Sequence, residues 1–325
     1  MSAPLLEVKN LRVEFPTRRG TLVVVDDVCF DIAPGEVLGV VGESGAGKSL
    51  TGMAIIGLLE PPGRIAAGQI LLEGSRIDDL RPESLRRIRG RRIGAIFQDP
   101  LTSLDPLYTI GRQITETILA HLPVSRGEAR ERAIALLAEV GIPAPERRLD
   151  HYPHQFTGGM RQRVVIALAL CAQPRLIIAD EPTTALDVST QAQIITLLQR
   201  LSREHGAAVM LITHDMGVIA ETAHRVAVMY AGRIAEIGPV RSILGAPSHP
   251  YTAGLMRSIP RVGATGARLA QIDGAMPRLD AIPSGCAFHP RCPQRFEPCD
   301  RARPALFETG DRRAACWLHG DAPAS

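Results

Sequence analysis

Apolar and polar positions alternate along the start of the chain. Within residues 5–32 the apolar positions include Leu6, Val8 and Leu11, and a further apolar stretch covers residues 22–25. A period of two residues is typical of β-strands that bury one face. The pattern therefore predicts antiparallel strands joined by a turn at residues 16–20.

Beyond residue 32, apolar runs of strand length alternate with longer helical patterns. The strand-like runs lie at residues 38–41, 68–74, 93–97, 176–179, 208–213, 226–230 and 233–237. The helical patterns lie at residues 50–59, 82–89, 109–140, 164–171 and 189–204. Buried strands alternating with helices predict an α/β fold, in which Ala231 and Gly232 turn the last two strands into a hairpin.

The charge balance gives little reason to expect a nucleic-acid partner. The 325 residues carry 37 basic and 34 acidic side chains, for a net charge of +3, and 4 % of the residues are aromatic. We interpret the arginine-rich residues 86–92 as a solvated face, because no aromatic residues alternate with them. Residues 1–10 lack the pattern of a signal peptide, and no run of 18 uncharged apolar residues occurs. We expect a cytoplasmic chain that does not itself cross a membrane.

The strand at residues 38–41 runs directly into a glycine-rich loop, residues 42–49, and the helical pattern at residues 50–59 follows. The loop has the spacing G-x-x-x-x-G-K-S. In such loops, backbone N–H groups converge on phosphate oxygens, a lysine adds positive charge and a serine hydroxyl serves Mg²⁺. The sequence therefore predicts a nucleoside triphosphate site. Its phosphate-binding residues are Gly42, Ser44, Gly45, Gly47, Lys48 and Ser49.

Polar side chains follow three of the buried strands, where α/β sheets gather their ligand residues. Gln98 comes after residues 93–97 and can ligate Mg²⁺ or orient water. Asp180 and Glu181 end the strand at 176–179, so that the first carboxylate serves Mg²⁺ and the second polarises the attacking water. His214 follows residues 208–213 and is a candidate sensor of the γ-phosphate.

Two further features bear on nucleotide binding. Thr157, Gly158 and Gly159 form a second cluster of anion-seeking donors at the start of a helix. Phe15 lies among the first strands, where it either stacks on an adenine ring or packs in the core. A second phosphate-binding loop in one chain requires an explanation.

Over residues 5–245 these motifs resemble the nucleotide-binding domain of ATP-binding cassette (ABC) proteins. Five elements occur in family order, namely residues 42–49, Gln98, residues 156–163, Asp180-Glu181 and His214. The resemblance implies a RecA-like P-loop ATPase core with an antiparallel β-subdomain and an α-helical subdomain at about residues 99–165. It also implies that two cassettes pair head to tail, so that the signature loop of one closes on ATP held by the other.

The same resemblance implies roles for single residues. Glu181 would be the general base, His214 the switch residue, and Asp187 part of the loop that couples the two ATP sites. The family usually has Ser where this chain has Thr157, which keeps the hydroxyl and adds a methyl group. The resemblance thus implies an ATPase, in contrast to a non-hydrolysing regulatory cassette.

Five segments are similar to the ATPase subunits of dipeptide and oligopeptide importers: residues 41–45, 97–100, 152–156, 249–252 and 285–293. This similarity implies peptide uptake through two separate membrane permeases, with an extracytoplasmic substrate-binding protein and a second ATPase in a heterodimer or homodimer. The chain would sit peripherally on the cytoplasmic face of the inner membrane and dock the permeases through residues 98–105 and the helical insert.

Two sets of alternatives remain open at this point. Importers related to these carry nickel complexes, glutathione or oligosaccharides. A soluble ABC ATPase that acts on DNA or ribosomes is disfavoured, because there is no long coiled coil and no basic tail.

Four of the six cysteines lie near the end of the chain, in an extension predicted at residues 246–325 and rich in Pro and Gly up to residue 285. They are Cys286, Cys292, Cys299 and Cys316. Four thiolates can hold Zn²⁺ or anchor an iron–sulfur cluster, with His289 or His319 able to replace a thiolate around zinc. Resemblance to the peptide importers favours a 4Fe-4S cluster, while zinc and free thiols remain alternatives. Cys29 and Cys171 are expected to pack in the core.

Overall fold

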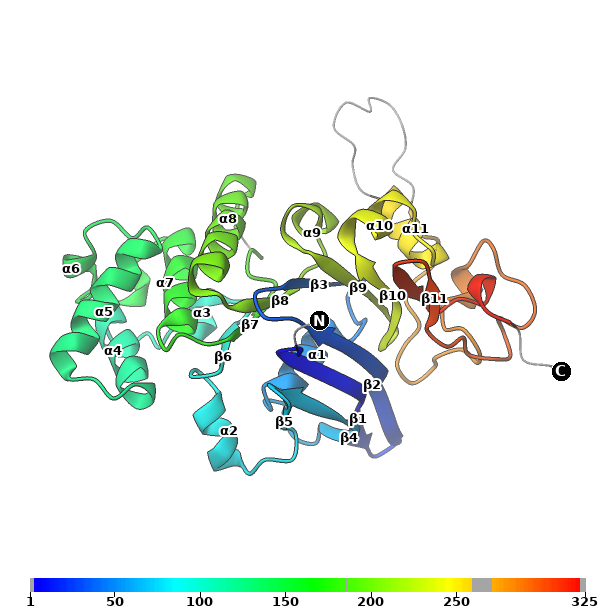
Figure 1. Ribbon diagram of the computed structural model, residues 1–325, viewed down its shortest axis with the longest axis horizontal. Coiled ribbons are helices and arrows are strands. Elements are labelled where there is room, and N and C mark those ends of the chain that lie inside the picture. The colour runs from blue at the N-terminus through cyan, green and yellow to red at the C-terminus, as the bar shows by residue number, and fades with distance from the viewer. Residues whose placement is uncertain (1–2, 185, 259–270, 322–325) are drawn as a thin grey trace. The chain divides into compact units, whose positions relative to one another are not determined.

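The computed structural model describes residues 3–184, 186–258 and 271–321 (Figure 1). The chain divides into two compact units. Unit 1 comprises Met1–Leu5, Ile32–Glu36 and Asp79–Leu211, and unit 2 comprises Leu6–Asp31, Val37–Asp78 and Ile212–Ser325. Each unit carries part of the predicted site.

Unit 2 contains an antiparallel sheet with the strand order β2-β1-β4-β5. Its strands are β1 (Leu6–Thr17), β2 (Gly20–Ile32), β4 (Arg64–Leu72) and β5 (Ser75–Arg76). The register of β1 on β4 runs from Leu6 opposite Leu72 to Glu14 opposite Arg64. The antiparallel strands expected from the alternating pattern are confirmed, and the turn between β1 and β2 is tighter than residues 16–20.

A second sheet in unit 2 has the order β11-β12-β10-β9-β3. It consists of β3 (Val37–Val41), β9 (Arg225–Tyr230), β10 (Arg233–Pro239), β11 (Phe307–Thr309) and β12 (Arg312–Ala314). Strand β3 is buried along its whole length and runs parallel to β9, and β9 and β10 form the expected hairpin. The helices of unit 2 are α1 (Lys48–Ile55), α9 (Met216–Thr222), α10 (Val240–Gly245) and α11 (Pro250–Arg257).

Helix α1 is shorter than the predicted residues 50–59. Gly57 adopts a left-handed conformation with φ of 65°. The N–H of Leu58 then donates to the carbonyl of Met53 at 2.9 Å, which closes the end of the helix. The apolar pattern thus continues past the point at which the glycine ends the helix.

Unit 1 contains strands in the order β8-β7-β6, of which β6 and β7 are parallel, with helices around them. The strands are β6 (Ile93–Ile96), β7 (Leu176–Asp180) and β8 (Ala208–Ile212), whose last residue falls in unit 2. The helices are α2 (Pro82–Ile88), α3 (Pro100–Ser103), α4 (Ile110–His121), α5 (Arg126–Glu139), α6 (Pro145–Arg148), η1 (Pro153–Gln155), α7 (Gly158–Leu170) and α8 (Val188–His205).

Two predicted helices of unit 1 have different bounds in the structure. The pattern at residues 109–140 forms two helices, because Pro123 interrupts it and Ser125 starts α5 with a capping box to Glu128. Helix α7 begins at Gly158, at the helix start expected for the two glycines, and so extends beyond the helical pattern at residues 164–171. The Thr157 side chain caps it.

The C-terminal extension is not a compact unit of its own. Strand β12 pairs with β10, placing Ala314 opposite Glu236, so residues 271–321 belong to unit 2. Helix α11 and the short turns η2 (His289–Arg291) and η3 (Trp317–His319) give more order than the Pro and Gly content suggests. Residues 259–270 of the predicted Pro- and Gly-rich segment lie outside the described residues.

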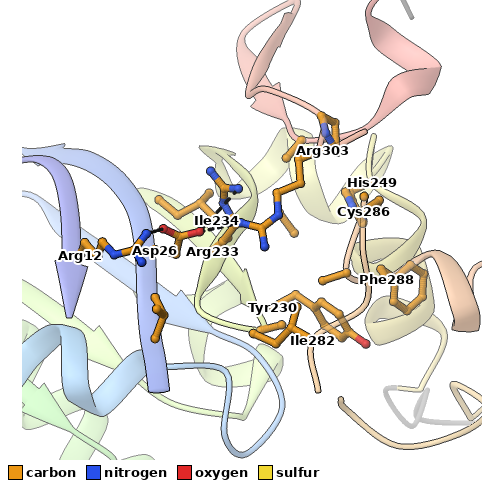
Figure 2. Close-up of a pocket in the computed structure, with 17 residues that line it drawn as sticks. Arg12, Asp26, Tyr230, Arg233, Ile234, His249, Ile282, Cys286, Phe288 and Arg303 are labelled. Atoms are coloured by element: carbon orange, nitrogen blue, oxygen red, sulfur yellow. Dashed lines mark hydrogen bonds and ion pairs between the residues drawn. The ribbon is translucent and has the colours of Figure 1, made fainter. Parts of the chain in front are cut away.

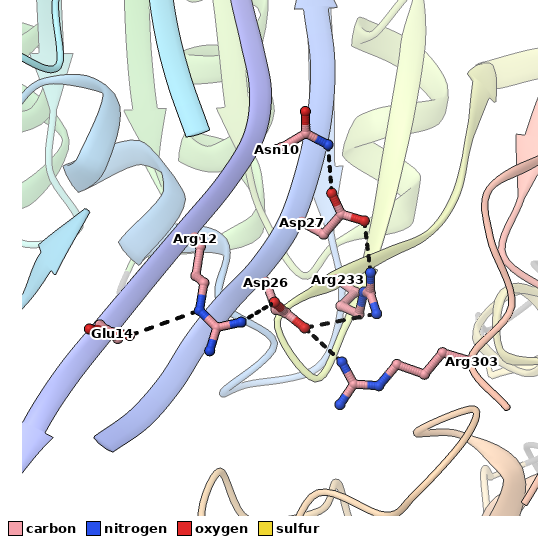
Figure 3. A network of polar contacts seen from close by, with 7 residues as sticks. All are labelled: Asn10, Arg12, Glu14, Asp26, Asp27, Arg233 and Arg303. Carbon is pink, nitrogen blue, oxygen red and sulfur yellow. Dashed lines mark hydrogen bonds and ion pairs between the residues drawn. The ribbon is translucent and has the colours of Figure 1, made fainter. Parts of the chain in front are cut away.

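A polar network also ties the extension to the antiparallel sheet (Figure 3). Asp26 of β2 accepts from Arg303 of the extension at 2.7 Å and from Arg12 of β1 at 3.1 Å. Arg233 donates to Asp27 at 2.9 Å. These side chains are partly exposed, so the pairs contribute more to orientation than to stability.

None of the helices formed by the described residues combines the length and the apolar character needed to cross a membrane.

Candidate functional site

The glycines of the loop at residues 42–49 are required by its backbone. Gly42, Gly45 and Gly47 have φ values of 153°, 84° and 97°. A Cβ on Gly42 would lie 2.2 Å from the carbonyl oxygen of Met229, and one on Gly47 would lie 2.9 Å from that of Val24. Any residue with a Cβ at position 42 or 47 would clash, and its backbone would be strained at these φ values. Glycines are therefore needed for the loop conformation that brings the backbone N–H groups together.

The buried cation of this loop is Lys48, which is 6 % exposed. Its Nζ donates to the carbonyl oxygens of Gly42 at 2.8 Å and Glu43 at 3.0 Å. Helix α1 begins here with no side-chain cap and no acidic residue in its first turn. The helix dipole and the lysine charge thus favour an anion at a place where Ser44, Gly45 and Ser49 are exposed.

His214 lies near the same loop within unit 2. The N–H of Thr213 donates to the carbonyl of Val40 at 3.1 Å, next to the end of β3 from which the loop departs. His214 itself is exposed, and Asp215 caps α9. The structure therefore brings the predicted sensor to the end of the strand that carries the phosphate-binding loop.

Phe15 is half-buried on β1 and contacts the backbone after α1. A Cβ on Gly63 would lie 2.6 Å from its ring atoms. Both readings of this side chain, adenine stacking and packing, stay predictions.

Unit 1 brings together Gln98, Asp180 and Glu181. The register of β6 on β7, with Ile96 opposite Ala179, sets the ends of both strands at one edge. The Gln98 Nε2 donates to the Glu181 Oε2 at 3.3 Å, and the Thr184 hydroxyl donates to the same oxygen at 2.8 Å. Two donors thus fix the carboxylate that the sequence analysis assigns as the base.

Glu181 also has an unusual backbone, with a φ of 45°. A left-handed conformation in a residue other than glycine costs on the order of 1 kcal/mol and is frequent at functional sites.

The second glycine-rich loop, also in unit 1, has a different character. Thr157 accepts a hydrogen bond from the N–H of Met160 at 3.4 Å, and both Thr157 and Gly158 are exposed. A Cβ on Gly158 would meet the Leu186 side chain at 3.7 Å, an ordinary contact. Within the described residues, nothing that we see requires a glycine at position 158.

Asp187 caps helix α8 beside this loop. Its carboxylate accepts from the Ser189 hydroxyl at 2.6 Å and from the Thr190 N–H and hydroxyl at 2.9 and 2.7 Å. These bonds, that from Ser189 first, hold the pKa of Asp187 well below its usual range. The side chain therefore stays ionised at neutral pH.

Two residues that the sequence analysis did not assign contact the phosphate-binding loop. The Tyr251 hydroxyl accepts from the N–H of Glu43 at 2.9 Å, and Arg291 forms an ion pair with the Glu43 carboxylate at 3.0 Å. Both lie in segments quoted for the importer resemblance, 249–252 and 285–293. The similarity of these two segments to the importer ATPases pointed to them in the sequence, but it indicated no role for either side chain.

The four C-terminal cysteines influence one another electrostatically. Burial raises the pKa of the Cys286 thiol to about 11, and the charges of Cys299, Cys316 and Cys292 add to the rise. Burial also raises the pKa of Cys292 and of Cys316, with smaller effects from the neighbouring cysteines. Across residues 3–184, 186–258 and 271–321, no group of three or more His, Cys, Asp or Glu is arranged to hold a metal ion. A cluster or zinc at these cysteines stays a prediction.

A cavity of about 170 Å³ lies beside Cys286 (Figure 2). Tyr230, His249 and Phe288 line it together with Arg233 and Arg303. Burial lowers the pKa of His249 to about 4, so its imidazole is neutral.

The remaining cysteines differ from each other. Cys171 is buried, as expected. Cys29 was expected in the core but is half-buried on β2, where its sulfur accepts from the N–H of Asn10 at 3.0 Å.

Comparisons with known proteins agree with these features. Residues 25–184 match the family described as "ABC transporter", and residues 235–299 match "Oligopeptide/dipeptide transporter, C-terminal region". The dipeptide transport ATP-binding protein DppD of Bacillus subtilis is 49 % identical over 97 % of this chain and 94 % of its own length. The oligopeptide transport ATP-binding protein OppD of Escherichia coli is 47 % identical over 96 % of this chain and 93 % of its own.

Among solved structures, similarity extends to a dimeric ATP-binding cassette, MJ0796, in a post-hydrolysis state bound to ADP and phosphate. It has a TM-score of 0.65 and 30 % sequence identity, and the match covers 73 % of this chain and 99 % of that one.

Proposed function

The chain belongs to the ABC transporter family, among the ATP-binding subunits of dipeptide and oligopeptide importers, and from this premise we propose that it hydrolyses Mg-ATP to drive peptide uptake. The observation that carries the proposal is the loop around Lys48, with its enforced glycines and an exposed, uncapped helix start. The names of the relatives favour peptides over nickel, glutathione or oligosaccharides as the cargo.

In the proposed reaction, the N–H groups of residues 42–49 and Lys48 bind the phosphates. Ser49, Gln98 and Asp180 would hold the Mg²⁺, which supplies charge neutralisation when bound. Glu181 accepts a proton from a water molecule while the oxygen of that water bonds to the γ-phosphorus. The bond between the γ-phosphorus and the bridging oxygen of the β-phosphate breaks, which leaves ADP and phosphate. His214 senses the γ-phosphate.

We further propose that two cassettes share each ATP. An exposed glycine at position 158 with no role that we can see inside its own chain is accounted for if a phosphate approaches it from outside. Val188, next to Asp187, is 82 % exposed and would be covered if a second cassette packed there. The second cassette is a different ATPase or another copy of this chain.

The permeases would dock on unit 1. A groove of about 1000 Å³ there is lined by residues of α2 and α4 and of the loop before α4. Near it, Leu101 and Leu107 are 60 % and 78 % exposed. The arginines Arg86, Arg87 and Arg89 line the groove, so the basic run would face a membrane partner. This arrangement supports docking through residues 98–105 and the helical insert. We also propose, from the importer family alone, that the chain sits at the cytoplasmic face of the inner membrane and that an extracytoplasmic substrate-binding protein delivers the cargo.

We propose that the chain divides into a cassette at residues 1–245 and an extension at residues 246–325. We also propose that the four cysteines of the extension hold a 4Fe-4S cluster. The support is that burial and the neighbouring cysteines raise the pKa of Cys286, Cys292 and Cys316, so a cationic group would relieve the cost of ionising these thiols together. The test is to purify the chain without oxygen and measure iron, acid-labile sulfide and zinc. Stoichiometric zinc, or no metal, would contradict the cluster.

The experiment for the whole proposal is to tag the chain in its native host, solubilise the membranes gently and identify the co-purifying proteins by mass spectrometry. Two polytopic permeases, with or without a second cassette, are expected. Recovery with ribosomes or DNA in the soluble fraction would overturn the importer proposal.

A further inference from the structure

The guanidinium of Arg291 joins the C-terminal extension to the phosphate-binding loop. Its side chain is 8 % exposed, and its Nη1 donates to both carboxylate oxygens of Glu43, at 3.1 and 3.0 Å. The other N–H groups donate to main-chain carbonyls of Ile272, Asp273 and Gly274. A single buried side chain thus links three segments of unit 2.

Glu43 is also held through its backbone. Its N–H donates to the Tyr251 hydroxyl at 2.9 Å, and its carbonyl accepts from the Lys48 Nζ at 3.0 Å. Tyr251 is fully buried, with ring centroids 4.6 Å from Tyr230 and 5.4 Å from Phe288. Aromatic packing therefore fixes the hydroxyl, and the hydroxyl fixes the backbone that holds the lysine.

The charge of Glu43 makes this contact relevant to ATP. A carboxylate in the loop that receives a triphosphate repels the ligand unless a cation neutralises it. Arg291 supplies that cation from outside the loop, and the burial of its side chain reduces the screening of the pair by solvent.

We propose that Arg291 and Tyr251 are positioning residues for ATP binding, through which the C-terminal extension sets the ATP affinity of its own cassette. The inference rests on the proposed ATP binding at Lys48.

The chain offers a matched control in Arg303. This arginine also links the extension to a carboxylate, Asp26 at 2.7 Å, but it acts on β2 and leaves Glu43 untouched (Figure 3). Arg303→Gln therefore removes a second, more exposed tie to the extension without changing the charge beside the loop.

The test compares purified full-length variants by calorimetric titration with Mg-ATP and by ATP turnover. Arg291→Gln is expected to raise the Kd and the KM for ATP about tenfold with little change in kcat, while Arg303→Gln leaves both values within about twofold. Adding Glu43→Gln to Arg291→Gln should restore most of the affinity, because it removes the uncompensated charge. Denaturant unfolding of the same variants separates the two causes, because a purely structural role would move the midpoint of unfolding in step with the Kd.

Tyr251→Phe is a second test, for use if Arg291→Gln does not fold. This substitution removes only the hydroxyl that holds the Glu43 backbone, and it should weaken ATP binding several-fold. An unchanged Kd in folded Arg291→Gln and Tyr251→Phe, or an equal loss in Arg303→Gln, would overturn the inference. Failure of the proposed function looks different, because then the unmodified chain itself binds no ATP, or Lys48→Ala binds it equally well.

Discussion

Gly42 and Gly47 of the first glycine-rich loop and Gly158 of the second are glycines for different reasons. At residues 42–49 the backbone has positive φ values and touches Met229 and Val24, so a Cβ is excluded from within. At position 158 the nearest atom to a Cβ would be 3.7 Å away, and the residue is exposed. Because no contact among the described residues requires a glycine at position 158, we attribute this glycine to a group that approaches from another molecule.

The two loops also differ in the polar groups that they offer to a phosphate. The first loop carries a buried lysine at an uncapped helix start, whereas the second offers the Thr157 hydroxyl, which makes a long bond of 3.4 Å to its own helix. The difference supports the proposal that each loop supplies half of a phosphate site, which a second cassette completes.

The largest effect is expected from Glu181→Gln, which should bring the two loops together on one ATP. Loss of the base should lower ATP turnover about 10² to 10⁴-fold, while ATP still binds. Paired cassettes should then accumulate with ATP and be visible by light scattering. A regulatory cassette without hydrolysis would show the same turnover before and after the change.

Gly47→Ala tests whether the first loop is set from within. Strain at a φ of 97° and the contact with Val24 should lower the free energy of unfolding by about 1–3 kcal/mol and weaken ATP binding more than tenfold. Denaturant unfolding and calorimetry measure both. Gly206→Ala, also at positive φ but with open space around it, serves as the control and should leave ATP binding unchanged.

Thr157→Val sharpens the account of the second loop, because it keeps the shape and removes the hydroxyl. ATP turnover should fall about tenfold, and loss of the α7 cap should cost about 1 kcal/mol of stability. Thr157→Ser should behave like the unmodified chain within about twofold, since the hydroxyl remains. Equal turnover in all three proteins would show that this hydroxyl takes no part.

The smallest effect concerns Asp187, beside the second loop. Its folded-state pKa lies below the usual value, so its cap stabilises the protein above about pH 4 and is lost as pH falls toward the folded-state pKa. The melting temperature of Asp187→Ala should be lower than that of the unmodified chain at pH 7. Thermal scans should show this gap narrowing below about pH 4, and a gap that widens there would be contrary to the assigned cause.

Features that depend on a short stretch of consecutive residues could be predicted from the sequence. The strands at residues 38–41 and 176–179, the loop at 42–49 and the pair Asp180-Glu181 depend on local pattern, and the structure has them as elements or at element ends. Where local signals compete, the bounds were wrong: Gly57 ends α1 early and Pro123 divides the long helix.

The contacts made by Arg291 and Tyr251 could not be predicted. Glu43 and Arg291 are 248 residues apart in the chain, and no periodicity or spacing relates them. Their pairing depends on how β10, α11 and the extension fold back within unit 2.

The most direct test of the account is Gly158→Ala, measured for ATP affinity in the isolated chain and for ATP turnover in the assembled importer. The account predicts an unchanged Kd, a free energy of unfolding within about 0.5 kcal/mol of the unmodified chain, and turnover reduced about tenfold or more. Unchanged turnover would contradict the shared ATP site, and a loss of ATP affinity in the isolated chain would show that the glycine serves its own cassette.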